Sequence, residues 1–223
     1  YTLSLHDALP IYARGERILQ YGAGVQAAGF AYDDQGRLER MTNWLVIPYH
    51  GRPVDIANGV QVTRWDYDSS RGWLSHKYDP SDWNGASRAT GIEHRYDLSG
   101  RPSQRIWGRG VTTTYGYIAG ELHSIAYSDG LTPNVTFARD SRGRFTNAVS
   151  MLGGTVVDRI AYAYNDAGQL LGEAHPQGVL GDFVVGSGFS AQGRRTTLGL
   201  TGNGASYGVT FAPGPGSRLS RVT

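Results

Sequence analysis

The amino-acid sequence predicts an all-β fold of tandem antiparallel β-hairpins that form a curled, spiral sheet. A short pattern, Tyr-Asp-x-x-Gly-Arg-Leu, recurs along the 223 residues. The chain also has 32 glycines, 14 tyrosines and 5 tryptophans, a composition that suits short strands joined by tight turns. No window longer than about 12 residues has the hydrophobic period of an amphipathic helix.

The recurring pattern sets the length of the repeating unit. Its glycine returns about every 24 residues in the C-terminal half, and the first two steps are longer. This period predicts about eight units, each a single hairpin. The marker positions are Gly36, Gly72, Gly100, Gly120, Gly143, Gly168 and Gly193, with Ser217 in the same place of a degenerate eighth copy.

The clearest copy, residues 32–38, has the residue preferences of a type I turn that closes on a left-handed glycine. Asp33 can accept hydrogen bonds from the backbone amides ahead of it, and Gly36 can adopt a positive φ. Tyr32 and Leu38 then face each other across the strands, and Arg37 is expected on the opposite face. The same interpretation applies to Tyr96, Asp97, Gly100, Arg101, Gly143, Arg144, Tyr164, Gly168, Gly193 and Arg194. The copy at 67–74 is one residue longer, and the copy at 117–122 one shorter.

The segments that flank these turns have strand character, because they are β-branched, aromatic or alternating. The segment 127–133 supplies a turn between two hairpins, and the apolar stretch 43–51 has the length of a strand. The clearest predicted strands are residues 111–117, 122–127, 158–164 and 205–211.

The first eleven residues are treated separately. YTLSLHDALPI matches, residue for residue, the translation of a common short-read sequencing adapter. We therefore expect residues 1–11 to be an artefact and residues 12–223 to be a repeat array truncated at both ends.

Stacking is what stabilises such hairpins, because a lone hairpin is marginal in water. Eight hairpins give about 16 strands, and open twisted sheets rarely exceed about 10 strands without curling. The sequence therefore predicts a wall or spiral.

These residues resemble the RHS/YD-repeat proteins of bacteria. YDDQGRL, YDLSGRP and YNDAGQL are the best copies, and the match covers residues 12–223. The resemblance implies a secreted or cell-surface protein whose hairpin spiral closes into a hollow shell around a C-terminal toxic effector, which it delivers to another cell. The implied partners are the rest of that shell and its effector. The family's self-cleaving DPxG-type motif has no match here, since the one Asp-Pro pair, Asp79–Pro80, lacks its context.

Composition and motifs argue against several other functions. The formal net charge is only +2, and acidic residues are interleaved with arginines along the chain. The sequence therefore shows no basic stripe of the kind that binds nucleic acid. There is no cysteine and no apolar run of membrane-span length. The G-x-G-x-x-A segment in 21–29 precedes a turn rather than a helix. Residues 80–91 lack the key ligands of a calcium loop, and the histidines show no metal-binding spacing. We therefore expect this chain to have no catalytic residue, cofactor or metal site, and we expect that it is not an enzyme.

The main alternative is a cell-surface adhesin or carbohydrate-binding array. Exposed aromatic side chains can stack on sugar rings, and the five tryptophans lie in the N-terminal half. Trp83, in a Gly/Ser/Asn-rich loop, is the best candidate for contact with a glycan. Packing on the inner face of the sheet is the competing explanation for the tryptophans.

Overall fold

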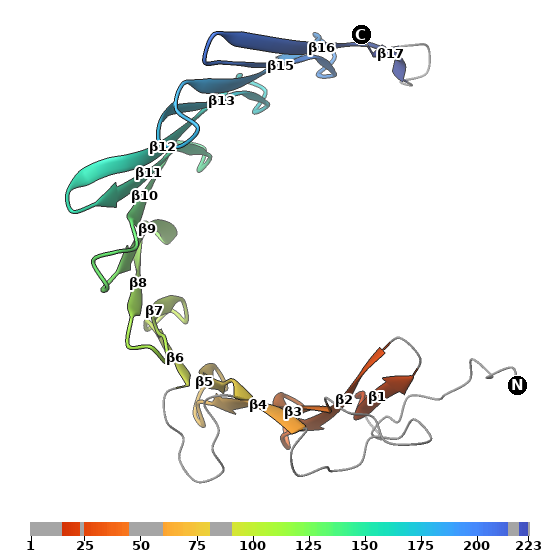
Figure 1. Ribbon diagram of the computed structural model, residues 1–223, viewed down its shortest axis with the longest axis vertical. Helices are drawn as coiled ribbons and strands as arrows, with labels where there is room; N and C mark the ends of the chain where they lie inside the picture. Colours follow the sequence, from red (N-terminus) through yellow and green to blue (C-terminus); the bar gives the residue numbers. More distant parts are fainter. Residues whose placement is uncertain (1–14, 23–24, 45–59, 81–90, 214–218, 223) are drawn as a thin grey trace, which may run out of the picture. The chain divides into compact units, whose positions relative to one another are not determined.

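The computed structural model describes residues 15–22, 25–44, 60–80, 91–213 and 219–222. The chain divides between Thr112 and Thr113 into two units, each of which is built from antiparallel strands (Figure 1). No α-helix occurs in the described ranges, so none there could cross a membrane. The predicted all-β class is confirmed.

The first unit consists of hairpins in which each strand pairs with the next along the chain, from β1 to β7. The β5–β6 junction is the shortest of these, with two residue pairs. The strands are β1 (Leu19–Gly22), β2 (Val25–Tyr32), β3 (Leu38–Trp44), β4 (Val60–Tyr67), β5 (Leu74–Tyr78), β6 (Ile92–Tyr96) and β7 (Pro102–Ile106).

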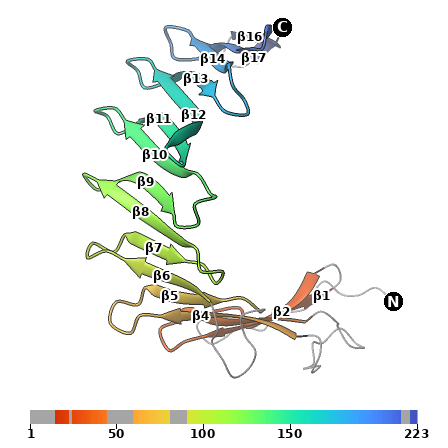
Figure 2. The same cartoon turned by 60° about the vertical axis from the view of Figure 1, so that its left-hand side comes forward.

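The second unit repeats this topology, again with sequential antiparallel pairing, from β8 to β17 (Figure 2). Its strands are β8 (Thr112–Ile118), β9 (Glu121–Tyr127), β10 (Asn134–Arg139), β11 (Phe145–Leu152), β12 (Thr155–Tyr164), β13 (Leu170–Gln177), β14 (Phe183–Phe189), β15 (Arg195–Gly202), β16 (Ala205–Pro213) and β17 (Leu219–Val222).

The predicted strands fall where the residue pattern places them. Residues 111–117, 122–127, 158–164 and 205–211 correspond to β8, β9, β12 and β16 within a few residues at each end. The turn predicted at 127–133 joins β9 to β10. Of the apolar stretch 43–51, Asn43 and Trp44 belong to β3, and the rest lies outside the described residues, as do residues 1–11 and Ser217.

The two faces of the second unit differ in character. Tyr162, Glu173, Val185, Leu200 and Tyr207 stand in one row of directly opposed pairs across β12–β16. The adjacent row consists of Ala163, Gly172, Gly186, Gly199 and Gly208. Because successive side chains of a strand point to opposite faces, one face carries mainly aromatic and aliphatic groups, with the carboxylate of Glu173 among them, where the other is nearly bare.

Each unit is a single layer of sheet among the residues that the structure describes, and very few side chains are buried. The buried apolar residues are Ala27, Ala28, Tyr78 and Ile92, whereas Leu200 is 40% exposed and Tyr207 is 71% exposed. Globular domains usually bury a sheet face against a second layer. The apolar face of this sheet lacks such a layer within the described part of the chain.

Candidate functional site

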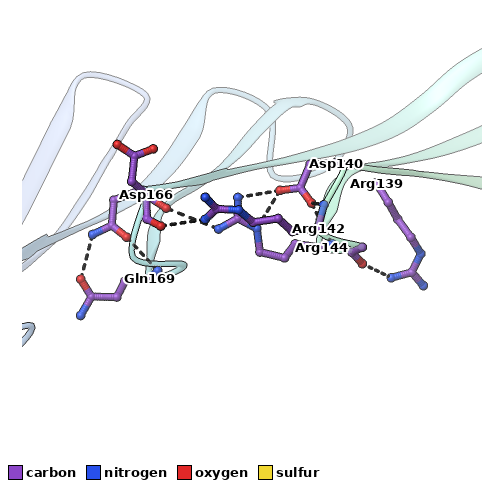
Figure 3. Close-up of polar contacts among 8 residues, drawn as sticks. Arg139, Asp140, Arg142, Arg144, Asp166 and Gln169 are labelled. Carbon is purple, nitrogen blue, oxygen red and sulfur yellow. Dashed lines mark hydrogen bonds and ion pairs between the residues drawn. The ribbon is translucent and has the colours of Figure 1, made fainter.

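The feature that the chain builds repeatedly is a hydrogen-bonded turn, seen most completely at residues 140–144 (Figure 3). The Gly143 amide donates to the Asp140 carbonyl at 3.0 Å, and the Asp140 amide to the Arg144 carbonyl at 2.9 Å. Asp140 Oδ1 accepts the backbone amides of Arg142 and Arg144 at 2.9 and 3.0 Å. Its Oδ2 accepts Arg144 Nε at 2.7 Å, with Nη2 at 2.6 Å. We call this arrangement the turn clasp.

The same clasp forms at 33–37 and 97–101. Arg37 Nε donates to Asp33 Oδ2 at 2.7 Å, and Arg101 Nε to Asp97 Oδ2 at 2.8 Å. Hydrogen bonds, led by those from the backbone amides of Arg37 and Arg101, hold the pKa of Asp33 and of Asp97 below the usual value. The side chain of Arg144 is the leading cause of the lowered pKa of Asp140. These carboxylates are occupied in holding their own turns.

Other copies keep the backbone geometry and change the side chains. At 165–169 the charged pair is replaced by amides, and Asn165 Nδ2 donates to Gln169 Oε1 at 2.8 Å. The Ser190 hydroxyl accepts the Arg194 amide at 3.3 Å. At 68–73 the residue after the glycine is Trp73, and Asp68 Oδ1 accepts the Ser70 and Arg71 amides at 3.0 and 2.6 Å.

The predicted turn glycines have the predicted backbone conformation. Gly36, Gly72, Gly100, Gly143, Gly168 and Gly193 have φ between +73° and +84°. Gly120 is different, because Ala119 and Gly120 both have positive φ and form a two-residue hairpin loop between Ile118 and Glu121. A further turn of the clasp's backbone type, missed by the sequence analysis, runs from Trp107 to Val111, where the Gly110 amide donates to the Trp107 carbonyl at 2.8 Å.

The apolar pairs across the turns are confirmed, and Arg37 contacts both its own turn and the next copy. Tyr32 is opposite Leu38, and Tyr164 is opposite Leu170. Arg37 turns back onto Asp33, and its guanidinium carbon lies 4.4 Å from the ring centroid of Tyr67, the tyrosine of the next copy. The ion pair and this cation–π contact stabilise that position.

Tyrosine hydroxyls add a second link between neighbouring copies. Tyr67 donates to the Leu38 carbonyl at 2.8 Å, and Tyr96 to the Leu74 carbonyl at 3.0 Å. Burial raises the pKa of both phenols. In these two copies, the tyrosine of the repeat pattern thus donates a hydrogen bond to the backbone of the preceding copy.

The remaining candidate sites are those for a glycan and for a metal ion. Trp83 and the calcium-like residues 82–85 lie outside the described residues. Trp73 packs on Tyr96, with ring centroids 5.1 Å apart, and Arg105 lies 3.7 Å from the Trp107 ring centroid. In the described ranges, no group of three or more His, Asp or Glu side chains is placed to hold a metal ion.

Comparison with known proteins decides the fold. No family model and no curated protein matches the sequence. Among solved structures, a crystal structure of TcdB2-TccC3 matches with a TM-score of 0.55 and 14% identity over 92% of this chain. That complex has an RHS-repeat shell. This chain has the RHS/YD-repeat fold.

Two further structures with this RHS-type fold match at similar distance. TcdB2-TccC3-Cdc42 matches with a TM-score of 0.54 and 14% identity over 92% of this chain. A Photorhabdus luminescens Tc holotoxin pore matches with a TM-score of 0.51 and 13% identity over 88% of this chain. The chain spans only 12–13% of the length of these chains, so the similarity concerns a small part of each.

Proposed function

We propose that this chain is a segment of the wall of an RHS-type shell, in a secreted or surface protein that encloses and delivers a C-terminal effector. In this role the fragment performs no catalysis. Its partners are the remaining hairpins of the shell and the enclosed effector. Containment is the mechanism, because a continuous hydrogen-bonded wall separates the effector from the cell that makes it.

One observation carries the proposal: a single-layer array of RHS-type hairpins leaves one apolar face uncovered. On β15 and β16 that face includes half-exposed Leu200 and exposed Tyr207. A soluble protein rarely leaves a large contiguous apolar surface in water, so we expect another polypeptide to cover this face. An enclosed polypeptide provides that cover, and the bare opposite row of glycines is suited to the outside.

The decisive experiment starts from the complete gene, read across both ends of this segment from the original DNA. We expect further Tyr-Asp repeats, then an unrelated C-terminal domain, and no codons for residues 1–11. The full-length protein is then purified and treated with protease. The C-terminal domain should survive in the intact protein and be digested after the shell is opened with denaturant.

Two results would refute the proposal. One is a gene that ends in a membrane anchor or a lectin-like module instead of an effector. The other is a C-terminal domain that is digested equally fast before and after opening. Saturable binding of the full-length protein to a glycan array would then favour the adhesin alternative.

A further inference from the structure

In four joints of the described chain, the residue that follows a turn glycine reaches beyond its own turn to the glycine of the next copy. A Cβ added to Gly72 would lie 2.8 Å from Arg37 Nη1, and one added to Gly100 would lie 2.9 Å from Trp73 Cζ2. At Gly193 the corresponding atom is Gln169 Nε2 at 3.2 Å, and at Gly168 it is Arg144 Nη1 at 3.7 Å. In these four joints, the preceding copy covers the turn of the following one.

The side chain after the turn glycine occupies the same place in these four joints, although its chemical type differs. Arg37 and Arg144 lie over the tyrosine rings of the next copies, 4.4 and 4.5 Å from the centroids of Tyr67 and Tyr164. Trp73 covers Tyr96 as an aromatic pair. Gln169 contacts the next turn directly, because its Nε2 donates to the Gly193 carbonyl at 2.7 Å. A cation, an indole and an amide thus occupy equivalent places.

The joint between 118–121 and 140–144 is built differently. Here the residue after the glycine is Glu121, which pairs at 3.7 Å with Arg139, the residue in the tyrosine position of the next copy. An added Cβ on Gly143 would meet nothing within 4 Å. Arg139 instead donates to the Gly143 carbonyl at 2.8 Å from within the same copy. This copy therefore secures its turn with its own side chain.

We propose that the residue after the turn glycine is an inter-repeat coupler, which holds the turn of the following copy closed and passes local order toward the C-terminus. Stability in repeat proteins is approximately a sum of terms for each repeat and for each interface between neighbours. The coupler is a specific, directional part of that interface term. It acts in the hairpin array whatever the wall encloses.

The test is amide hydrogen exchange on the full chain carrying Arg144→Ala. The readouts are the amides of Gly168 and Gln169, which bond to the carbonyl and side-chain oxygens of Asn165. We expect them to exchange about five- to tenfold faster, the change that follows loss of a contact worth about one hydrogen bond. The loop 118–121 on the other side should be unchanged.

Glu121→Ala is the matched control, because that joint lacks a coupler over the glycine. It should leave exchange of the Gly143 amide within about twofold of the parent, since Arg139 still holds that turn. If Arg144→Ala prevents folding, Gln169→Ala serves instead, with the Gly193 and Arg194 amides as readouts. Unchanged exchange in the following turn overturns the proposal, as does equal acceleration on both sides of the substituted copy.

Discussion

Two glycines with nearly equal backbone conformations offer the sharpest test of the geometry. Gly100 has φ of +83° and Gly143 has φ of +78°. Replacing either glycine by alanine destabilises the turn by about 1–2 kcal/mol, because an L-residue is strained in the left-handed backbone conformation. At Gly143 the added methyl enters open space, whereas at Gly100 it meets the Trp73 ring at 2.9 Å. Overpacking adds about 1–3 kcal/mol, so Gly100→Ala should cost about 2–5 kcal/mol in total.

The assay is the free energy of local opening, from native-state hydrogen exchange at each turn and at its flanking strands. Gly100→Ala combined with Trp73→Ala should recover the overpacking part, giving a coupling energy of about 1–3 kcal/mol in a double-mutant cycle. Equal costs for Gly100→Ala and Gly143→Ala, or a coupling energy of zero, would refute the reasoning that Trp73 closes the next turn.

Further predictions concern acid, the repeat hydroxyl and the open face. Hydrogen bonds lower the pKa of Asp140 in the folded protein. The ionised Asp140 side chain therefore contributes its full stabilisation above its unfolded pKa near 3.8, and this stabilisation is lost as the pH falls through its folded pKa. Turn 140–144 should therefore loosen in acid while the amide-paired turn 165–169 does not, as followed by the NMR shifts of both turns. Asn165→Asp with Gln169→Arg should transfer the acid sensitivity to that turn, and a turn that stays insensitive would contradict the equivalence of the two clasps. Tyr67→Phe should cost about 0.5–1.5 kcal/mol through its lost bond to the Leu38 carbonyl, measured by urea unfolding. The isolated chain should self-associate in sedimentation velocity through its open apolar face, and Tyr207→Lys should reduce this; a monodisperse parent at high concentration would argue against an uncovered face.

Local residue chemistry predicted most of the hairpin. Asp33, Gly36 and the Tyr32–Leu38 pair lie within seven residues, so their turn geometry depends on short-range preferences that a sequence displays directly. At Gly120, however, short-range residue preferences did not predict the turn type. The shorter spacing from Tyr117 to Leu122 leaves room only for a two-residue loop, and there the same glycine takes part in a different turn.

The contacts between copies could not be predicted in the same way. Arg37 and Tyr67 are 30 positions apart, and only the register of β3 on β4 brings the guanidinium over that ring. The amide pair of Asn165 and Gln169 likewise looks like two separate substitutions in the sequence. In the structure it is a neutral version of the Asp–Arg clasp, because the paired groups face each other across one turn.

By itself, the sequence determined the all-β class, the repeat length and the turn chemistry, because each depends on residue types within one hairpin. The tertiary structure alone decided which side chain closes which turn. That choice depends on how strands from different copies pair, and it places Arg37, Trp73, Arg144 and Gln169 over the copy that follows. The physical reason is that a side chain's partner across a sheet is set by strand register, which joins residues far apart in the chain.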